Sequence, residues 1–373
     1  MKLLALLIIC LTLPACQKGS TKQATPDDAA NASAPASAVP TPANLLYPGE
    51  EKHLKNVKQL TFGGQNAEAY FSADGKWLIF QSERDGYPCD QMYVMRTDGS
   101  QLRRVSNGQG RVTCGYIIGD DPISPNPDQV IFSSTHDHGA ECPAKPDYSK
   151  GYVWPIYESF EMYTEKFGGG KLNRLTNNKF YDAEATVSPD QKEVVFTSTR
   201  DGDLDLYVMN VDGSKVRRVT KELGYDGGAF FSHDGEKLIY RAYHPQTAAE
   251  KKSYKEDLKN NLYRPTWLEL FIIGKDGKNK RQITNLKGGT FAPFLFPNDK
   301  RVIFASNYKN PRGRQFNIYA IDLDGKNLEQ ITDSGTFDSF PMFSPDGKKL
   351  VWASNRNGKE KHETNIFIAD WIE

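Results

Sequence analysis

Charged side chains recur at corresponding places along this chain of 373 residues. Acidic residues open the first apolar run of several repeated segments, and arginines follow the second run: the acids are Glu68, Asp182, Glu184, Asp226 and Asp338, and the arginines are Arg84, Arg200, Arg241 and Arg356. Carboxylates and guanidinium groups form strong charge-assisted hydrogen bonds. Gathered around a channel, they could hold a peptide or another polar ligand. Equally, they could pair with one another across neighbouring repeats.

Histidines extend this predicted binding surface, because His136, His138 and His244 lie in loops beside the same apolar runs. His136, Asp137 and His138 are close in sequence to Cys142, but no paired Cys-x-x-Cys accompanies them. A second group resembles a cation loop, although Asp-Gly-Asp is more typical of a tight turn: Asp201, Asp203 and Asp205. We therefore predict no metal and no cofactor, and assign no catalytic residue.

One repeated segment, residues 184–220, positions these groups. It contains four short runs, at 185–187, 194–198, 206–209 and 216–220, which we call strands a to d. β-branched and aromatic runs bounded by Pro, Asp and Gly predict strands, and Asp212-Gly213 is a dipeptide that favours a tight hairpin. The segment therefore predicts one antiparallel sheet of four strands.

The same unit recurs from residue 56 to the end of the chain. Its a–b turn reads Ser72-Ala73-Asp74-Gly75 in the first copy and Ser344-Pro345-Asp346-Gly347 in the last. Repeats of roughly 40–50 residues with four strands each are typical of β-propellers. The sixth copy has no strand d, but residues 56–61 supply a spare one. We predict an all-β fold: a six-bladed β-propeller of four-stranded antiparallel blades, closed by an N-terminal strand.

Insertions concentrate on one face of this propeller. The a–b and c–d turns share one face, and the b–c loops share the other with the d-to-a crossovers. Long b–c insertions occupy residues 136–158 and 244–265, and shorter ones occupy 308–315 and 357–364. Loops on a rigid scaffold carry binding groups. We therefore predict that the b–c face is the functional surface; neutral variation in loop length is the alternative.

Three cysteines belong to the repeats, and all three are expected at the rim of the b–c face: Cys89, Cys114 and Cys142. In an oxidising compartment two of them should form a disulfide and one should remain. The sequence does not decide which two.

The N-terminal part has a different composition. Residues 1–15 (MKLLALLIICLTLPA) predict a signal peptide, and Leu13-Pro14-Ala15-Cys16 resembles the lipobox of bacterial lipoproteins, which implies lipid on Cys16. Residues 16–52 are rich in Ala, Pro, Ser and Thr and predict a disordered tether with a reach of roughly 30 Å. The folded domain would span 53–373. Gln17 favours the outer membrane, facing the periplasm.

Charge excludes one class of function. The chain has 47 basic and 47 acidic residues and no net charge, whereas nucleic-acid-binding proteins carry basic surfaces. We predict no nucleic-acid partner, and we expect a monomer.

The repeats as a whole resemble a known family. The stretches SPDGKKLVWASNRNG and VSPDQKEVVFTSTRDGDLDLYVMNVDGSKVRRVT are similar to the PD40, or TolB-type, β-propeller repeat, and the likeness covers residues 56–371. The resemblance implies a periplasmic propeller that binds proteins such as the peptidoglycan-associated lipoprotein. The chain lacks the N-terminal α/β domain of TolB, and it lacks the G-x-S-x-G of related peptidases.

Two functions from different classes follow. The first is a non-enzymatic binding module for envelope protein or cell-wall partners. The second is a carbohydrate-active or hydrolytic enzyme with its site in the channel, because oligogalacturonate lyase shares a similar propeller. Carboxylates such as Asp182 and Glu184 cannot be assigned a catalytic separation from the sequence.

Overall fold

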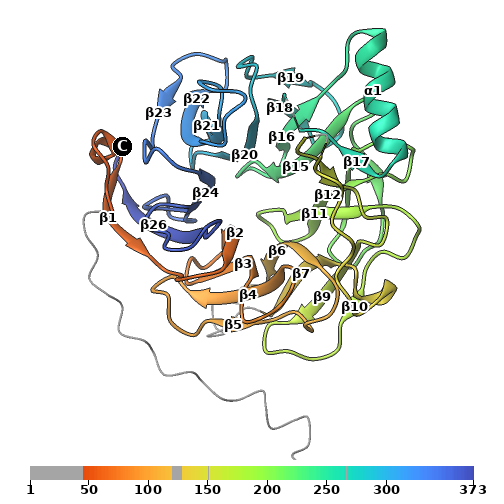
Figure 1. Ribbon diagram of the computed structural model, residues 1–373, viewed down its shortest axis with the longest axis horizontal. Helices are drawn as coiled ribbons and strands as arrows, with labels where there is room; N and C mark the ends of the chain where they lie inside the picture. Colours follow the sequence, from red (N-terminus) through yellow and green to blue (C-terminus); the bar gives the residue numbers. More distant parts are fainter. Residues whose placement is uncertain (1–44, 120–127, 150, 266) are drawn as a thin grey trace, which may run out of the picture. The chain divides into compact units, whose positions relative to one another are not determined.

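Six four-stranded antiparallel sheets surround a central channel in the computed structural model, which describes residues 45–119, 128–149, 151–265 and 267–373 (Figure 1). The predicted signal peptide, Cys16 and most of the predicted tether lie outside the described residues, as does most of the second a–b loop. The six-bladed propeller predicted from the sequence is confirmed.

Blades one to three follow the chain from its N-terminal side. Blade one contains β2 (Gln65–Phe71), β3 (Trp77–Glu83), β4 (Gln91–Arg96) and β5 (Arg103–Arg104). Blade two contains β6 (Val112–Ile118), β7 (Gln129–Ser134), β9 (Glu161–Lys166) and β10 (Asn173–Arg174). Blade three contains β11 (Asp182–Val187), β12 (Glu193–Ser198), β13 (Asp205–Asn210) and β14 (Arg217–Arg218).

Blades four to six complete the ring. Blade four contains β15 (Tyr225–Phe231), β16 (Lys237–Tyr243), β18 (Glu269–Gly274) and β19 (Arg281–Gln282). Blade five contains β20 (Thr290–Leu295), β21 (Arg301–Ser306), β22 (Asn317–Asp322) and β23 (Glu329–Gln330). Blade six contains β24 (Asp338–Phe343), β25 (Lys349–Ser354), β26 (Asn365–Trp371) and β1 (Leu54–Gln59).

The N-terminal strand closes the ring. β1 pairs antiparallel with β26, from Leu54 opposite Trp371 to Gln59 opposite Phe367. It takes the outermost place that strand d holds in the other blades. Blade six is therefore built from both ends of the folded part, and the edge of β26 is covered, as closed propellers require.

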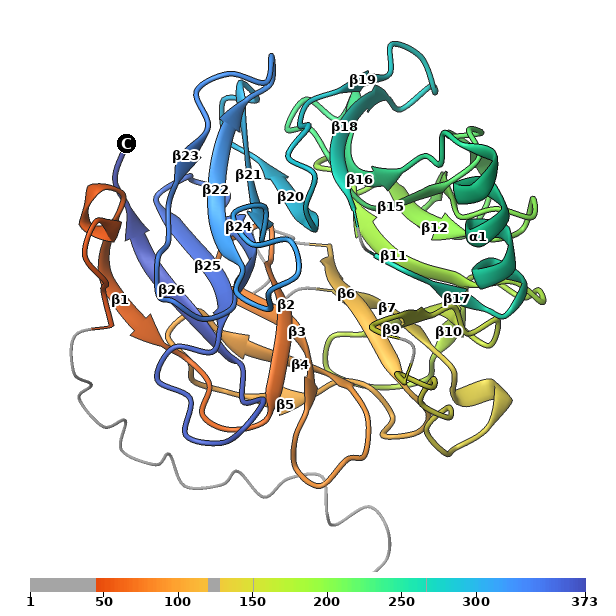
Figure 2. The ribbon, with the colours of Figure 1, turned by 45° about the horizontal axis from the view of Figure 1, so that its top comes forward.

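Short connections define the two faces of the propeller. In Figure 2 the c–d hairpins β18–β19 and β22–β23 point to the top, opposite the b–c loops. Five described elements lie outside the six sheets: the 3-10 turns Glu50–Lys52 and His136–His138, the helix α1 (Ala248–Lys259) in the b–c insertion of blade four, and the two short strands β8 (Trp154–Pro155) and β17 (Leu262–Tyr263). Apolar side chains between neighbouring sheets form the core, with Trp77 and Trp352 among the largest buried residues.

Candidate functional site

A ring of β-bulges shapes the channel. The pairing of strands a and b shifts register at the same place in every blade, for example between Ala67 and Tyr70 in blade one. Within each shift one residue has a left-handed backbone: Glu68, Cys114, Glu184, Gly228, Ala292 and Phe340. A bulge re-aims a side chain and is common beside functional sites.

A small cavity of about 20 Å³ lies between five of these bulges. Its lining is Glu68, Tyr70, Cys114, Glu184, Thr186, Gly228, Phe230, Arg241 and Ala292. A space of this size holds about one water molecule. A larger ligand must therefore bind above it, where the channel opens on the b–c face.

Glu184 and Arg241 form a buried ion pair at this cavity. The Glu184 carboxylate also accepts hydrogen bonds from Thr197 Oγ1 at 2.7 Å, from the backbone N–H of Gly228 at 3.0 Å and from Tyr225 Oη at 3.0 Å. Burial lowers the pKa of Arg241, but the charges near it, led by Glu184, outweigh burial and raise it well above its usual value. Glu184 and Arg241 are therefore fixed parts of the channel wall.

Glu68 and Cys114 face the same cavity and have fewer partners. Burial raises the pKa of the Glu68 carboxyl, and a hydrogen bond from Cys114 opposes that shift. Burial also raises the pKa of the Cys114 thiol well above its usual value, so the thiol stays protonated. Glu68 is thus the channel carboxylate that a ligand could engage most easily.

The two long b–c insertions join above blades three and four. β8 (Trp154–Pro155) of the first insertion pairs with β17 (Leu262–Tyr263) of the second. Tyr263 stacks on Tyr225 with ring centroids 4.3 Å apart, and Trp154 lies 5.0 Å from the guanidinium carbon of Arg241. We call this joined structure the roof. It brings aromatic rings to the edge of the channel, directly above the charged pair.

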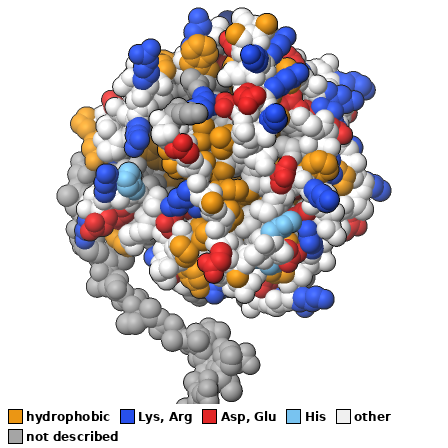
Figure 3. All heavy atoms as spheres, turned by 45° about the vertical axis from the view of Figure 1, so that its right-hand side comes forward, with side chains coloured by type: hydrophobic (Ala, Val, Ile, Leu, Met, Phe, Trp, Pro, Cys, Tyr) orange, Lys and Arg blue, Asp and Glu red, His pale blue; other side chains and the backbone are white. Residues whose placement is uncertain are grey.

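Blades five and six supply an aromatic wall on the other side of the channel. Its rings are Phe291, Phe316, Phe337 and Phe340, with neighbouring centroids 5.1–6.4 Å apart. Three of them are half-buried, namely Phe316, Phe337 and Phe340. Figure 3 shows hydrophobic side chains in the middle of the face, with most Lys and Arg side chains nearer its edge. The roof and these four phenylalanines together form an aromatic entrance to the channel, which we call the mouth. It lies above the charged residues of the cavity, Glu68, Glu184 and Arg241.

Most of the predicted acid–arginine ring is engaged inside single blades. Arg200 bonds both oxygens of Asp182, at 2.9 and 3.0 Å. Asp226 pairs in the same way with His244 at 2.9 Å, because His244 occupies the position of Arg200 in blade four. Asp182 with Arg200 and Asp338 with Arg356 pair within one blade, whereas Glu184 of blade three and Arg241 of blade four pair across neighbouring blades.

Arg241 was assigned to the wrong position in the repeat. It lies within β16, opposite Gly227, and not at the end of strand b where Arg84, Arg200 and Arg356 lie. In the sequence, Arg241 directly follows the apolar run Leu238-Ile239-Tyr240 and therefore looks like the residue after strand b. In the structure the strand continues beyond Arg241 through Ala242 and Tyr243. The shift places Arg241 in the channel.

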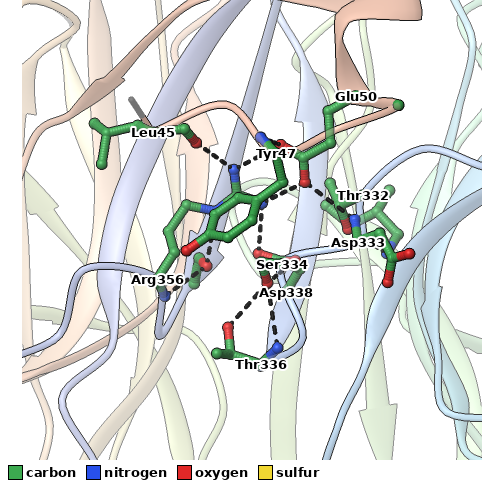
Figure 4. A network of polar contacts seen from close by, with 12 residues as sticks. Leu45, Tyr47, Glu50, Thr332, Asp333, Ser334, Thr336, Asp338 and Arg356 are labelled. Atoms are coloured by element: carbon green, nitrogen blue, oxygen red, sulfur yellow. Dashed lines mark hydrogen bonds and ion pairs between the residues drawn. The ribbon is translucent and has the colours of Figure 1, made fainter. Parts of the chain in front are cut away.

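Arg356 and Asp338 are inaccessible to a ligand. Arg356 is completely buried and bonds Asp338 at 3.0 Å, Glu50 at 3.0 Å and the carbonyl of Leu45 at 2.9 Å (Figure 4). The last two belong to residues 45–53, which we call the N-terminal segment. Leu45 and Glu50 fall within the predicted tether of residues 16–52, yet both are buried, and the pair of Arg356 and Asp338 stabilises the fold.

Arg84 differs from its counterparts. Blade one has Asn66 where blades three, four and six have Asp, and Asn66 accepts a hydrogen bond from Ser82. The nearest carboxylate to Arg84 is Asp85 at 3.7 Å, and its Nε and Nη1 are buried without a hydrogen-bond partner among the described residues. Within the described part of the chain, the Arg84 guanidinium therefore has only this long ion pair and a contact with the face of the Tyr93 ring, 5.7 Å from its guanidinium carbon.

The remaining histidines and aspartates do not converge. His136 contacts Ser134 at 2.8 Å and Tyr163, whereas His138 is exposed. The three aspartates of the loop resembling a cation site have separate protein partners: Asp201 binds Tyr207, Asp203 binds Tyr254, and Asp205 binds Arg218. Across the described ranges, no three His, Cys, Asp or Glu side chains come together as metal ligands do.

The structure joins Cys89 and Cys142 in a disulfide and leaves Cys114 unpaired and buried. The bond ties the insertion of blade two to the b–c loop of blade one. Cys114 lines the channel cavity rather than the rim, because it is the bulge residue of β6. Its position was not evident from the sequence, which carries no signal for a bulge.

The roof is the main feature that the sequence did not reveal. Its contacts join residues about a hundred positions apart, such as Trp154 and Tyr263. The only available signal was the presence of aromatic residues inside both insertions. No helix in the described part of the chain is long and apolar enough to cross a membrane.

Comparisons with known proteins agree with this architecture. A structure described as TolB of Agrobacterium tumefaciens is 18% identical, covers 83% of this chain and 91% of its own, and has a TM-score of 0.52. TolB of Acinetobacter baumannii is 16% identical, with 83% and 64% covered and a TM-score of 0.51. An oligogalacturonate lyase in complex with manganese is 15% identical, with 85% and 93% covered and a TM-score of 0.51. Identities this low establish the fold alone.

The family model described as the TolB beta propeller domain, PD40, matches residues 156–264 and 263–367. These matches cover more than half of the chain. The chain therefore belongs to the TolB β-propeller (PD40) family.

Proposed function

We propose that this protein is a non-enzymatic binding module of the bacterial cell envelope. It would be held at the periplasmic side of the outer membrane by lipid on Cys16, and it would bind an envelope protein or a peptidoglycan-associated partner through the mouth of its channel. The observation that carries the proposal is the aromatic mouth formed by the roof and by Phe316, Phe337 and Phe340.

The chemistry of the mouth supports a partner segment rather than a small molecule. The enclosed cavity measures only about 20 Å³, whereas small-molecule pockets usually measure about 300–1,000 Å³. Aromatic side chains dominate the energetics of protein interfaces. A short peptide could place an apolar side chain between Trp154 and Phe337 and a polar group above Glu68.

Site-specific photocrosslinking tests this proposal. A photoreactive phenylalanine analogue at Phe316 or Phe337 should capture a discrete partner in intact cells. The same analogue at Leu102 or Val216, which are exposed on the opposite face, provides the matched control. Capture only from Leu102 and Val216 would reject the channel mouth as the binding site.

The enzymatic alternative has a separate readout. The oligogalacturonate lyase among the similar structures contains manganese, so a glycan-cleavage screen should be run with and without added manganese. The channel carboxylate Glu184 is held by Arg241 and three further donors, and this arrangement favours a structural role. Turnover that is lost in Glu68→Gln would instead support an enzyme.

A further inference from the structure

We propose that the b–c face docks on the surface of an anionic phospholipid membrane. The proposal rests on the proposed function in one respect, the lipid anchor at Cys16, and it adds the orientation that the folded part adopts above the membrane. Three independent features of the b–c face carry it.

The first feature is the location of exposed aromatic residues. Five large aromatic side chains are exposed on the described surface, and all five lie in b–c loops or d-to-a crossovers: Phe62 (42%), Tyr148 (47%), Tyr152 (67%), Phe180 (38%) and Trp267 (50%). The other exposed large hydrophobic residues, Leu102, Val216 and Leu328, lie beside c–d turns on the opposite face. Tyr and Trp are the residues that proteins place at membrane–water interfaces.

The second feature is a group of basic side chains without acidic partners. Helix α1 exposes Lys251, Lys252, Lys255 and Lys259, while Tyr254 on its other side is buried against the propeller. The blade-five loop exposes Arg312 and Arg314. None of these six side chains makes a hydrogen bond or ion pair with any part of the chain that the structure describes.

On the opposite face, many of the lysines form ion pairs. Turn lysines there pair with aspartates of the same turn or strand: Lys76 with Asp74, Lys192 with Asp190, Lys237 with Asp234, Lys278 with Asp276, Lys326 with Asp324 and Lys349 with Asp370. The pairing there is not complete, because Lys215, Lys300 and Lys348 in turns of the opposite face make no ion pair with the described part of the chain. The b–c face differs in that its unpaired basic side chains accompany exposed aromatic residues. Clusters of Lys and Arg near a bilayer bind anionic lipids, at about 1 kcal/mol for each residue.

The third feature is the position of Leu45. The carbonyl of Leu45 accepts a hydrogen bond from Arg356, which follows strand b of blade six and therefore lies at the b–c face. Leu45, and with it the N-terminal side of the described chain, therefore lies at the face that carries the aromatic and basic groups. The proposed lipid anchor and a basic docking surface would act on one membrane, as anchors combined with basic patches do.

Docking is compatible with binding at the channel mouth. The basic and aromatic docking residues lie in α1 and in peripheral loops, whereas the mouth lies at the channel. A docked propeller would hold its mouth toward the membrane surface. The partner would then be a group that is itself held at that membrane.

The test uses the full lipidated chain reconstituted through its anchor into vesicles. Phospholipids brominated on their acyl chains quench tryptophans that reach the bilayer. We expect Trp267 to be quenched in vesicles containing phosphatidylglycerol, and not in phosphatidylcholine alone. The quenching should disappear in 1 M NaCl, where the Debye length is about 3 Å. Trp267→Phe identifies the signal of this residue.

Charge variants give the decisive result. Replacing Lys251, Lys252, Lys255 and Lys259 by Gln should lower the ratio of docked to undocked protein by roughly fivefold for each residue. Lys278→Gln with Lys326→Gln, on the opposite face, is the matched control and should leave it unchanged. Equal loss in both sets, or no quenching of the wild-type chain, would overturn the proposal.

Two further outcomes separate this proposal from its alternatives. In high salt, only the lipid anchor should keep the protein on the vesicles. Protein that floats with the vesicles there but shows no quenching at low salt would have a working anchor and no docking. Tight binding of soluble dextran sulfate without any quenching by lipid would identify an anionic polymer as the occupant of the face and would reject the membrane.

Discussion

The two faces of this propeller differ in the regularity of their loops. On the a–b and c–d face the same turn recurs: Ser72, Ser188, Ser232 and Ser344 each donate a hydrogen bond to the aspartate two residues later. On the b–c face no two loops are alike, and one contains a helix while another contains a disulfide-bonded cysteine. A repeated face maintains the fold, and an irregular face provides chemistry. The following predictions test this division, beginning with the largest effect.

Arg356→Ala should destabilise the protein most. The change leaves Glu50 and Asp338 buried without their cation, and breaking a buried ion pair costs about 3–5 kcal/mol. Urea unfolding followed by circular dichroism measures the free energy. Arg84→Ala at the same repeat position is the control and should cost far less, because the only ion pair of Arg84 in the described structure is a long one, 3.7 Å from the exposed Asp85. Equal costs would show that the burial of Arg356 contributes nothing.

Removing the Cys89–Cys142 disulfide should have the next largest effect. The bond closes a loop with a sequence separation of 53 residues, and losing such a crosslink costs about 2–4 kcal/mol. Cys89→Ser with Cys142→Ser should also expose residues 140–153 to proteases before the blades unfold. Limited proteolysis with mass spectrometry locates the first cuts. First cuts in the repeated turns instead would contradict the anchoring role.

Acid should weaken the attachment of the N-terminal segment. Burial raises the pKa of Glu329, but hydrogen bonds from Lys52, His53 and Arg301 lower it to about 2. A pKa below the unfolded value near 4.5 means that this carboxylate stabilises the fold above pH 4.5 and loses that effect as the pH falls toward 2. Stability measured against pH for the wild type and for Glu329→Gln should converge at the acid end.

Asp190→Ala should have the smallest effect. The carboxylate accepts hydrogen bonds from Ser188 Oγ at 2.7 Å and from the backbone of Lys192 at 3.2 Å in an exposed turn. A single hydrogen bond of this kind contributes about 1 kcal/mol. Thermal unfolding should shift slightly, and Asp346→Ala should shift it by a similar amount because Asp346 accepts the same two hydrogen bonds in its own turn. Strongly different shifts would show that the turns are not equivalent.

The repeated parts of the molecule could be predicted from sequence because their signals are local. Turn dipeptides such as Asp212-Gly213 and alternating apolar runs identify each strand, and the missing sixth strand d predicts the closure by β1. The strand proposed at residues 56–61 overlaps β1 (Leu54–Gln59).

The candidate site could be predicted only in part, because its contacts are not local. The b–c face was identified by its insertions, but the pairing of β8 with β17 depends on two segments that meet only in the folded state. Likewise, the burial of Arg356 depends on Leu45 and Glu50, which lie far from it in sequence. The bulge that turns Cys114 into the channel leaves no pattern in the residue types.

The closure of blade six by β1 also has a mechanical consequence. If the chain is held by the proposed lipid anchor at Cys16, a pulling force would reach residues 45–53 before it reaches β1, because they precede β1 in the chain. The load would first meet the buried contacts of Arg356 with Leu45 and Glu50, and only then the pairing of β1 with β26. The N-terminal segment would thus bear the pulling force first. The pairing of β1 with β26 would come under load only after the contacts of that segment are broken.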